Sequence, residues 1–343
     1  PMELLRGFAL LARTAGLIGQ LAEELRHPPV ANDIFLSVDL NNRSVPPDPP
    51  YGATVAELVA VIASTHHPFY HRASTSVGGE DRPPFADEWV RKIESFRETL
   101  TRARPDVLVM VGSDHFHQLW LDNMPQFLVG KAPVYDANWH NEEREFGLPR
   151  MRLNGQEDLS AYVLREGLDA GFDLAFSNEL RIDHSITCPI ITLRPEADLP
   201  IVPIYTNIFA PAAAPAETVR PARPHHPAAR RVVAVGQAGR GDRHRTPVAG
   251  ARRAAPVRPA RTRPAVRPEA VGWIAGGDVE ECLAEVSLDS LHLPGNATHG
   301  FMDFMLMMGV AGAGQKADYV DTYDLFHTME AYFTWYPNGS PPS

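Results

Sequence analysis

"DVLVMVGSDHFHQ", residues 106–118, joins an apolar run to a carboxylate and two histidines. The run is short, rich in β-branched residues and closed by Gly112, which is typical of an interior strand of a parallel sheet. Ligands of open α/β sheets bind beyond the carboxyl ends of such strands. The stretch therefore predicts that Asp114 and His115 lie where a ligand would bind, unless His115 and His117 only hydrogen-bond to neighbouring carbonyl groups.

Strand and helix patterns alternate from Thr54 onward. Apolar, β-branched runs predict strands, and amphipathic runs between them predict helices. The order indicates an α/β fold with a mostly parallel central sheet flanked by helices, in a single main domain spanning 54–343. Residues 1–53 are expected to form an extension, with a helix over 4–26 and a linker rich in Pro and Asn. The predicted strands are 55–64, 106–112 and 199–207, and the predicted helices are 85–103 and 157–171.

Composition excludes several classes of protein. A chain of 343 residues can bury a large core without covalent cross-links, and its two cysteines, Cys188 and Cys282, argue against a disulfide framework. The apolar N-terminal run is interrupted by Arg13 and has no clear cleavage site, so neither a signal peptide nor a membrane span is expected. These features predict a cytoplasmic protein.

The segment 213–270 differs from the rest of the chain. It holds thirteen arginines, no lysine and three acids, a charge of about +10. Because the net charge of the whole chain is −10, the remaining residues together carry about −20. Its Arg/Pro/Ala composition has two interpretations: a basic arm, or the translation of GC-rich DNA in a wrong reading frame. We favour the second, because only "RRVVAVG" at 230–236 resembles a strand. Without interleaved aromatic residues, nucleic-acid binding is not expected.

Three strand or helix junctions carry histidines. "STHHPFYHR" follows the first predicted strand, "GSDH" ends the strand at 106–112, and "IDHS" at 182–185 precedes a Cys-Pro pair. Three such junctions in one α/β unit favour a shared metal or acid–base site over three unrelated core histidines.

The same blocks resemble a known family. "STHHP", "GSDH" followed by "NMPQF", and "IDHSITCP" followed by "IVPIYTN" are similar to the signature blocks of class III extradiol ring-cleaving dioxygenases, which include protocatechuate 4,5-dioxygenase β subunits. The resemblance spans roughly 54–210 and returns at about 272–339. It implies an Fe(II) cofactor, a small aromatic diol and O2 as substrates, and a homo-oligomer.

The resemblance also implies roles for individual residues. His66, two residues before Pro68, and His115 match the family's two histidine ligands of iron. His184 matches a histidine that contacts substrate or oxygen, so His184 and His115 are the expected catalytic residues. Two imidazoles and one carboxylate form a facial triad that leaves positions open for both substrates.

The third ligand departs from the family pattern. The family glutamate follows a histidine at the start of a C-terminal helix, but here "GNATHGFMDF" places Gly300 at that position. Asp303, one turn further, is either a displaced third metal ligand or a solvated or capping residue. A second family histidine, in a "GGLSH"-like block, has no counterpart, because His244 lies two residues late within the atypical segment.

Other polar residues receive weaker assignments. Asp183 either fixes the tautomer of His184 or caps the helix that follows, and His117 is expected to point away from the site. Tyr205 and Asn207 are candidate pocket-lining groups. Ordinary surface or capping roles are expected for His71, His140 and His292, and His299 is left open.

Two functions therefore remain. The first is an Fe(II)-dependent dioxygenase that opens a catechol-type ring beside its hydroxyl groups, impaired by the missing glutamate. The second is a non-catalytic relative that keeps the scaffold as a binding protein.

Overall fold

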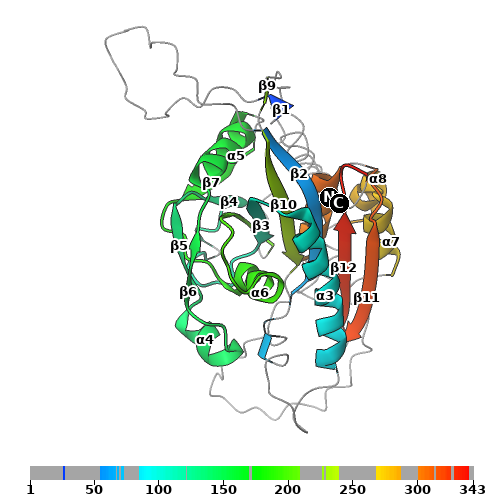
Figure 1. The fold of residues 1–343 in the computed structure, drawn as a ribbon, viewed down its shortest axis with the longest axis horizontal. Coiled ribbons are helices and arrows are strands. Elements are labelled where there is room, and N and C mark those ends of the chain that lie inside the picture. Colours follow the sequence, from blue (N-terminus) through cyan, green and yellow to red (C-terminus); the bar gives the residue numbers. More distant parts are fainter. Residues whose placement is uncertain are drawn as a thin grey trace.

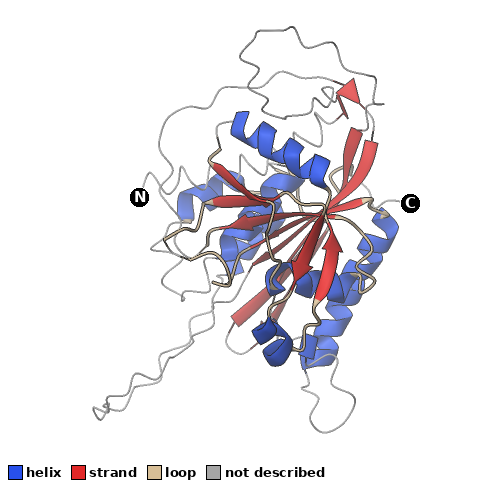
Figure 2. Ribbon diagram, turned by 90° about the vertical axis from the view of Figure 1, so that its left-hand side faces the viewer, coloured by secondary structure: helices blue, strands red, loops and turns tan. Residues whose placement is uncertain are grey.

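The structure is a computed structural model that describes residues 26–27, 55–66, 68, 71–72, 85–120, 122–169, 172–208, 226–227, 229–238, 268–286, 300–312, 314–325 and 328–339. Its centre is an eight-stranded mixed sheet, drawn in Figures 1 and 2 with helices on both sides. The order of strands is β11 (Tyr319–Leu325), β12 (Thr328–Trp335), β2 (Val55–Thr65), β10 (Ala229–Ala238), β3 (Val107–Gly112), β8 (Ile201–Thr206), β4 (Phe127–Gly130) and β7 (Leu174–Ser177).

The four inner strands β2, β10, β3 and β8 are parallel to one another. Antiparallel pairs flank them: β12 with β2 on one side and β4 with β8 on the other. The carboxyl ends of the inner strands consequently lie at one edge of the sheet. The fold class predicted from the sequence, α/β with a mostly parallel sheet between helices, is confirmed.

Side chains of the inner strands alternate between two hydrophobic cores. In β3, Val107, Val109 and Val111 pack with one cluster, and Leu108 and Met110 pack with the other. The strand is buried along its whole length, as expected of a parallel strand covered on both faces.

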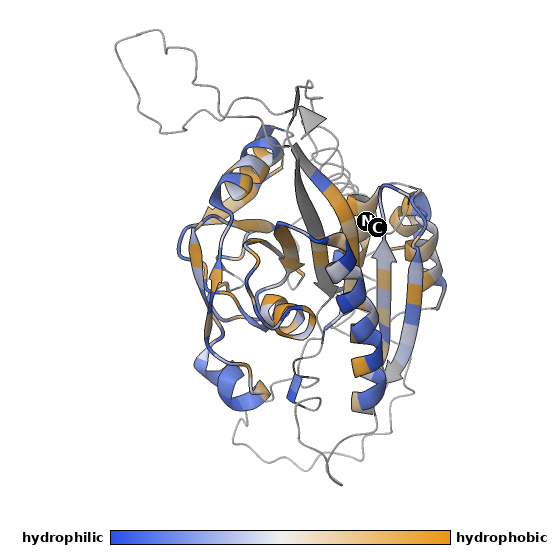
Figure 3. Ribbon diagram, in the orientation of Figure 1, coloured by the Kyte–Doolittle hydropathy of each residue, from blue (hydrophilic) through white to orange (hydrophobic). Residues whose placement is uncertain are grey.

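Different helices cover the two faces. On one face, α3 (Phe85–Ala103) and α6 (His184–Leu193) pack with the second cluster. On the opposite face are α5 (Glu157–Asp169), α7 (Pro268–Gly276), α8 (Val279–Glu285) and α10 (Phe301–Ala311). Every residue of α10 is buried, and Asp303 is its only residue with a polar side chain, as expected of a central helix. Helix α6 consists mainly of hydrophobic residues, whereas α4 (His140–Phe146) is mainly hydrophilic (Figure 3).

The predicted helix over 85–103 has these bounds in the structure, and the predicted strands correspond to β2, β3 and β8. Not predicted were α4, the hairpin β11–β12, and the small antiparallel sheet of β5 (Val134–Ala137) and β6 (Met151–Asn154). The strands of that small sheet are only four residues long and only partly apolar, so their pattern is weak.

The atypical segment contributes an inner strand. The strand-like run at 230–236 forms most of β10, which pairs with both β2 and β3. Two more of its residues form β9 (His226–Pro227), which pairs with β1 (Arg26–His27). The N-terminal helix prediction is thus wrong at Arg26, while 4–25, 213–225, 239–267 and the boundary at residue 53 lie outside the described residues. No helix in the described part of the chain is long and apolar enough to cross a membrane.

Candidate metal centre

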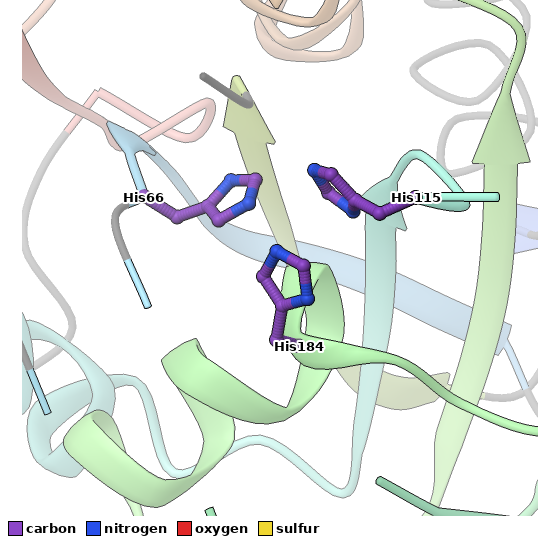
Figure 4. Close-up of side chains that lie close together, drawn as sticks. All are labelled: His66, His115 and His184. Carbon is purple, nitrogen blue, oxygen red and sulfur yellow. The ribbon is translucent and has the colours of Figure 1, made fainter. Parts of the chain in front are cut away.

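Three histidines meet at the carboxyl edge of the inner strands. His66 directly follows β2, His115 lies in the loop after β3, and His184 is the first residue of α6. Figure 4 shows their rings pointing toward one another. One ring nitrogen of each histidine lies within 4.8 Å of the corresponding nitrogens of the other two. The convergence predicted from three separate sequence blocks is therefore present in the structure.

The distances between rings place His184 in the same group as the other two. The ring centroid of His66 lies 5.3 Å from that of His115 and 5.5 Å from that of His184. The centroids of His115 and His184 are 4.0 Å apart. The sequence predicted His184 in a shell outside the other two, but its ring is the nearest neighbour of His115.

Asp183 holds His115. Its Oδ2 lies 2.8 Å from Nδ1 of His115, and the same oxygen accepts the backbone N–H of His115. Burial alone would raise the pKa of this fully buried carboxyl, but the hydrogen bond and charge of His115 hold it well below its usual range. Asp183 is therefore ionised at neutral pH, and Nδ1–H of His115 donates to it. Nε2 is then the nitrogen with which His115 could bind a metal.

The other oxygen of Asp183 caps α6. Its Oδ1 accepts hydrogen bonds from the backbone N–H and the hydroxyl of Ser185, and from the hydroxyl of Tyr205. The helix-capping prediction for Asp183 is confirmed, whereas the alternative that it fixes the tautomer of His184 is wrong. Tyr205, predicted to line a pocket, is buried and bonded to Asp183, and the role of buried Asn207 stays a prediction.

Glu142 holds His184, and sequence reasoning missed it. Its Oε1 lies 2.7 Å from Nδ1 of His184 and accepts the backbone N–H of the same residue at 2.8 Å. Oε2 accepts a hydrogen bond from the backbone N–H of Trp139, the residue before α4. Burial would raise the pKa of Glu142, but hydrogen bonds from His117 and His184 lower it overall. Two adjacent acids, Glu142 and Glu143, occur in α4, and the sequence gives no sign that only the first is buried.

His117 also belongs to this hydrogen-bonded support. Its Nε2 lies 3.3 Å from Oε1 of Glu142, and its ring stacks on Trp139 with centroids 5.4 Å apart. The expectation that His117 points away from the site is wrong, because the residue shares Glu142 with His184. Asp114, in turn, organises the loop: its Oδ2 accepts the backbone N–H groups of His117, Gln118 and Leu119.

Burial also affects His184 and Asp114. The pKa of His184 is lowered, first by burial and then by the charge of His115, so the ring is neutral at neutral pH. Burial and the nearby charge of Asp183 raise the pKa of Asp114 to about 6. A neutral imidazole is the form that binds a metal ion.

Asp303 is buried near this group but is not part of it. Its side chain is 1 % exposed, so the interpretation as a solvated residue is wrong, and α10 has no side-chain cap at its first turn. Its Oδ1 accepts a hydrogen bond of 2.6 Å from Thr206, the last residue of β8. Burial raises its pKa to about 7. Asp303 is not among the described residues whose possible ligand atoms lie within 4.8 Å of those of the three histidines.

The remaining histidines do not alter this picture. His140 is exposed at the start of α4, and His71 is partly buried, with its pKa lowered by burial. Neither is among the grouped metal-binding candidates of the described residues. His244, His292 and His299 lie outside the described residues.

Distant relatives of this chain are ring-cleaving dioxygenases. It is 31% identical over 117 residues to a 2,3-dihydroxyphenylpropionate/2,3-dihydroxicinnamic acid 1,2-dioxygenase of Azotobacter vinelandii, which covers 34% of this chain and 35% of that protein. The enzyme of the same name from Rhodococcus jostii is 26% identical over 163 residues, 47% of this chain and 48% of that protein. That name puts the hydroxyls on carbons 2 and 3 and the cleavage between carbons 1 and 2, beside the diol, so these homologues are extradiol enzymes.

The similarity is partial. The chain spans about a third to a half of the length of these curated relatives. No family model matches the chain. A solved structure of an uncharacterized protein from Escherichia coli K12 aligns with a TM-score of 0.44 at 13% identity, over 81% of this chain and 99% of that chain.

Proposed function

We propose that this protein is an Fe(II)-dependent extradiol dioxygenase of class III, which opens the ring of a small aromatic diol with O2. The convergence of His66, His115 and His184 at one edge of the sheet carries this proposal. Its support from relatives is the shared name of distant homologues that act on 2,3-dihydroxyphenyl compounds. A diol of that class is therefore the substrate to test first.

The donor set fits a transition-metal ion. Imidazole nitrogens bind Fe(II) readily, and a carboxylate behind a ligand histidine fixes its ring and increases its basicity. His66 and His115 are the proposed iron ligands, and Asp183 orients the second of them. When bound, iron supplies adjacent positions for the diol and O2 and a path for electron density from the ring to oxygen.

Two roles are open to His184. The resemblance implies proton transfer, and a neutral ring held by Glu142 could accept a proton from a hydroxyl of the diol. The alternative is a bond to the metal. Asp303, the third ligand predicted from the sequence, stays a prediction, since its Oδ1 is bonded to Thr206.

The test is ring cleavage by the reconstituted full chain. The protein is loaded with Fe(II) without oxygen, mixed with 2,3-dihydroxyphenylpropionate and exposed to O2, while oxygen consumption and a yellow ring-opened product are followed. We expect activity that His115→Ala abolishes and His140→Ala, at an exposed histidine, leaves unchanged. If the iron-loaded chain consumes no oxygen, the protein is a non-catalytic relative that keeps the scaffold.

Two predictions from the sequence accompany the proposal: a cytoplasmic location and a homo-oligomeric assembly. Cell fractionation and size-exclusion chromatography with light scattering test them separately from the chemistry.

A further inference from the structure

Among the described residues, no carboxylate joins the three-histidine group as the resemblance implies. Gly300, at the start of α10, has no side chain to offer, and Asp303 is not within the distance that joins the three histidines. We infer that His184 is the third protein ligand, so that His66, His115 and His184 form a three-imidazole site for a divalent first-row transition-metal ion. This inference deepens the proposed function by naming the ligand set of the same site.

The spacing of the rings fits a shared ion. A metal bound about 2.0–2.1 Å from each nitrogen in tetrahedral geometry separates neighbouring ring centroids by about 5 Å. The 5.3 Å and 5.5 Å separations of His66 from the other two rings agree with this value. The 4.0 Å between His115 and His184 is about 1 Å shorter, so these two rings must move apart by about that distance when a shared ion binds.

The two closer rings are held in the orientation that a metal ligand needs. Nδ1 of His115 bonds to Asp183 and Nδ1 of His184 bonds to Glu142, so Nε2 is the metal-binding nitrogen of both. Carboxylates behind ligand histidines are the usual supporting arrangement at protein metal sites. Both carboxylates are fully buried, and together they place two negative charges behind the rings, which compensates the charge of a divalent ion.

The carboxylates themselves are poor candidates for ligands. Glu142, Asp183, His117 and His184 also lie close enough together to form a second group. The oxygens of Asp183 already accept five hydrogen bonds, from His115, Ser185 and Tyr205. Those of Glu142 bond to His184 and Trp139. A metal ion there would have to break these bonds, so the second group orients the first.

The experiment is a titration of the full chain with Co²⁺ under nitrogen, followed by visible absorption and by equilibrium dialysis. We expect one Co²⁺ per chain in the unaltered protein. His184→Ala, and His184→Gln, which keeps a polar side chain of similar volume, should each lower the affinity by about a hundredfold and change the spectrum. The matched control is His140→Ala, which removes an exposed histidine at the start of α4 that belongs to neither group, and it should leave the affinity and the spectrum unchanged.

Several outcomes would overturn the inference: unchanged affinity and spectrum in both His184 variants, loss of binding in Asp303→Ala, or no Co²⁺ binding by the unaltered protein. Circular dichroism identifies a variant that fails to fold. In that case His184→Gly with added imidazole replaces it, and the spectrum should return with imidazole if the inference holds and be insensitive to it otherwise. Because the titration uses neither diol nor O2, a chain that binds Co²⁺ through His184 but opens no ring would refute the proposed function alone.

Discussion

Helices α6 and α10 begin at the same edge of the sheet, yet their first turns differ in chemistry. At α6, Asp183 caps the helix and orients His115, and His184 follows directly. At α10, Gly300 occupies the cap position without a side-chain hydrogen bond, and buried Asp303 bonds to Thr206. At the start of α6, Asp183 thus both stabilises the helix and orients a histidine of the site. The start of α10 has a glycine, Gly300, where the resemblance predicts a carboxylate.

The largest effect is expected from Asp183→Ala. This change removes the cap of α6 and leaves Tyr205, Ser185 and His115 with buried donors that have lost their acceptor. We expect the free energy of unfolding to fall by about 3–5 kcal/mol, measured by urea denaturation. Asp198→Ala, at an exposed aspartate paired with Arg194 beyond the end of α6, is the control and should cost about 1 kcal/mol or less. Equal losses in the two variants would show that the start of α6 is not specially stabilised.

Glu142→Gln tests the support of the α6 site from a different element. An amide keeps the size of the side chain but removes the charge that holds Nδ1–H of His184, so the affinity for Co²⁺ or Fe(II) should fall by about 10–100-fold. Glu143→Gln, one residue along the same helix and paired with Arg150 at the surface, is the control. Equal affinity in both variants would contradict the orienting role of Glu142.

The start of α10 should make stability depend on pH. Burial raises the pKa of Asp303 to about 7, above its value in the unfolded chain. Between about pH 4 and 7 the unfolded state therefore binds fewer protons than the folded state. Asp303 should therefore contribute a loss of about 1.4 kcal/mol of stability for each unit that the pH rises in that window. Urea denaturation from pH 4 to 7.5 measures the slope, and Asp303→Asn should remove this contribution. The same slope in both proteins would show that Asp303 keeps an ordinary pKa.

Gly300→Glu would bring the two helix starts closer in chemistry, with the smallest expected effect. The backbone of Gly300 has φ −58° and ψ −17°, which any residue adopts, so no strain arises from the conformation. A carboxylate entering at the start of α10 should raise metal affinity by about tenfold, because it adds a charged ligand. Gly300→Gln has the same shape without the charge and should have little effect. A decrease in affinity with Glu would show that this helix start does not face the metal.

The inner strands and the histidines could be predicted from sequence because both signals are local. Strand β3 is a continuous apolar run, and the polar residues that follow it lie at its carboxyl end by chain connectivity alone. The partners of these histidines could not be predicted in this way. Asp183 lies next to His184 in the chain but bonds to His115, 68 residues away, because the capping geometry of α6 turns its side chain.

Glu142 shows the same limit. It lies 42 residues before its partner His184, in a short polar helix whose pattern carries no sign of burial. Its contact arises only when α4 packs beside the start of α6. Tertiary packing of this kind also decides that Asp303, polar by nature, is enclosed in the all-buried helix α10.

The position of β10 has a consequence for how the chain folds. Strands β2 and β3 are separated by β10, which is contributed by residues 229–238, more than a hundred residues after β3. During synthesis the edges of β2 and β3 that pair with β10 stay unpaired until β10 has been made. Unpaired apolar strand edges are sites of misassociation. Contacts between such distant segments slow folding, since the long loop must close before the pairing stabilises it. We therefore expect the pairing of the four inner strands to be completed only after residue 238 has left the ribosome, and the second edge of β2 to be covered later still, by β12.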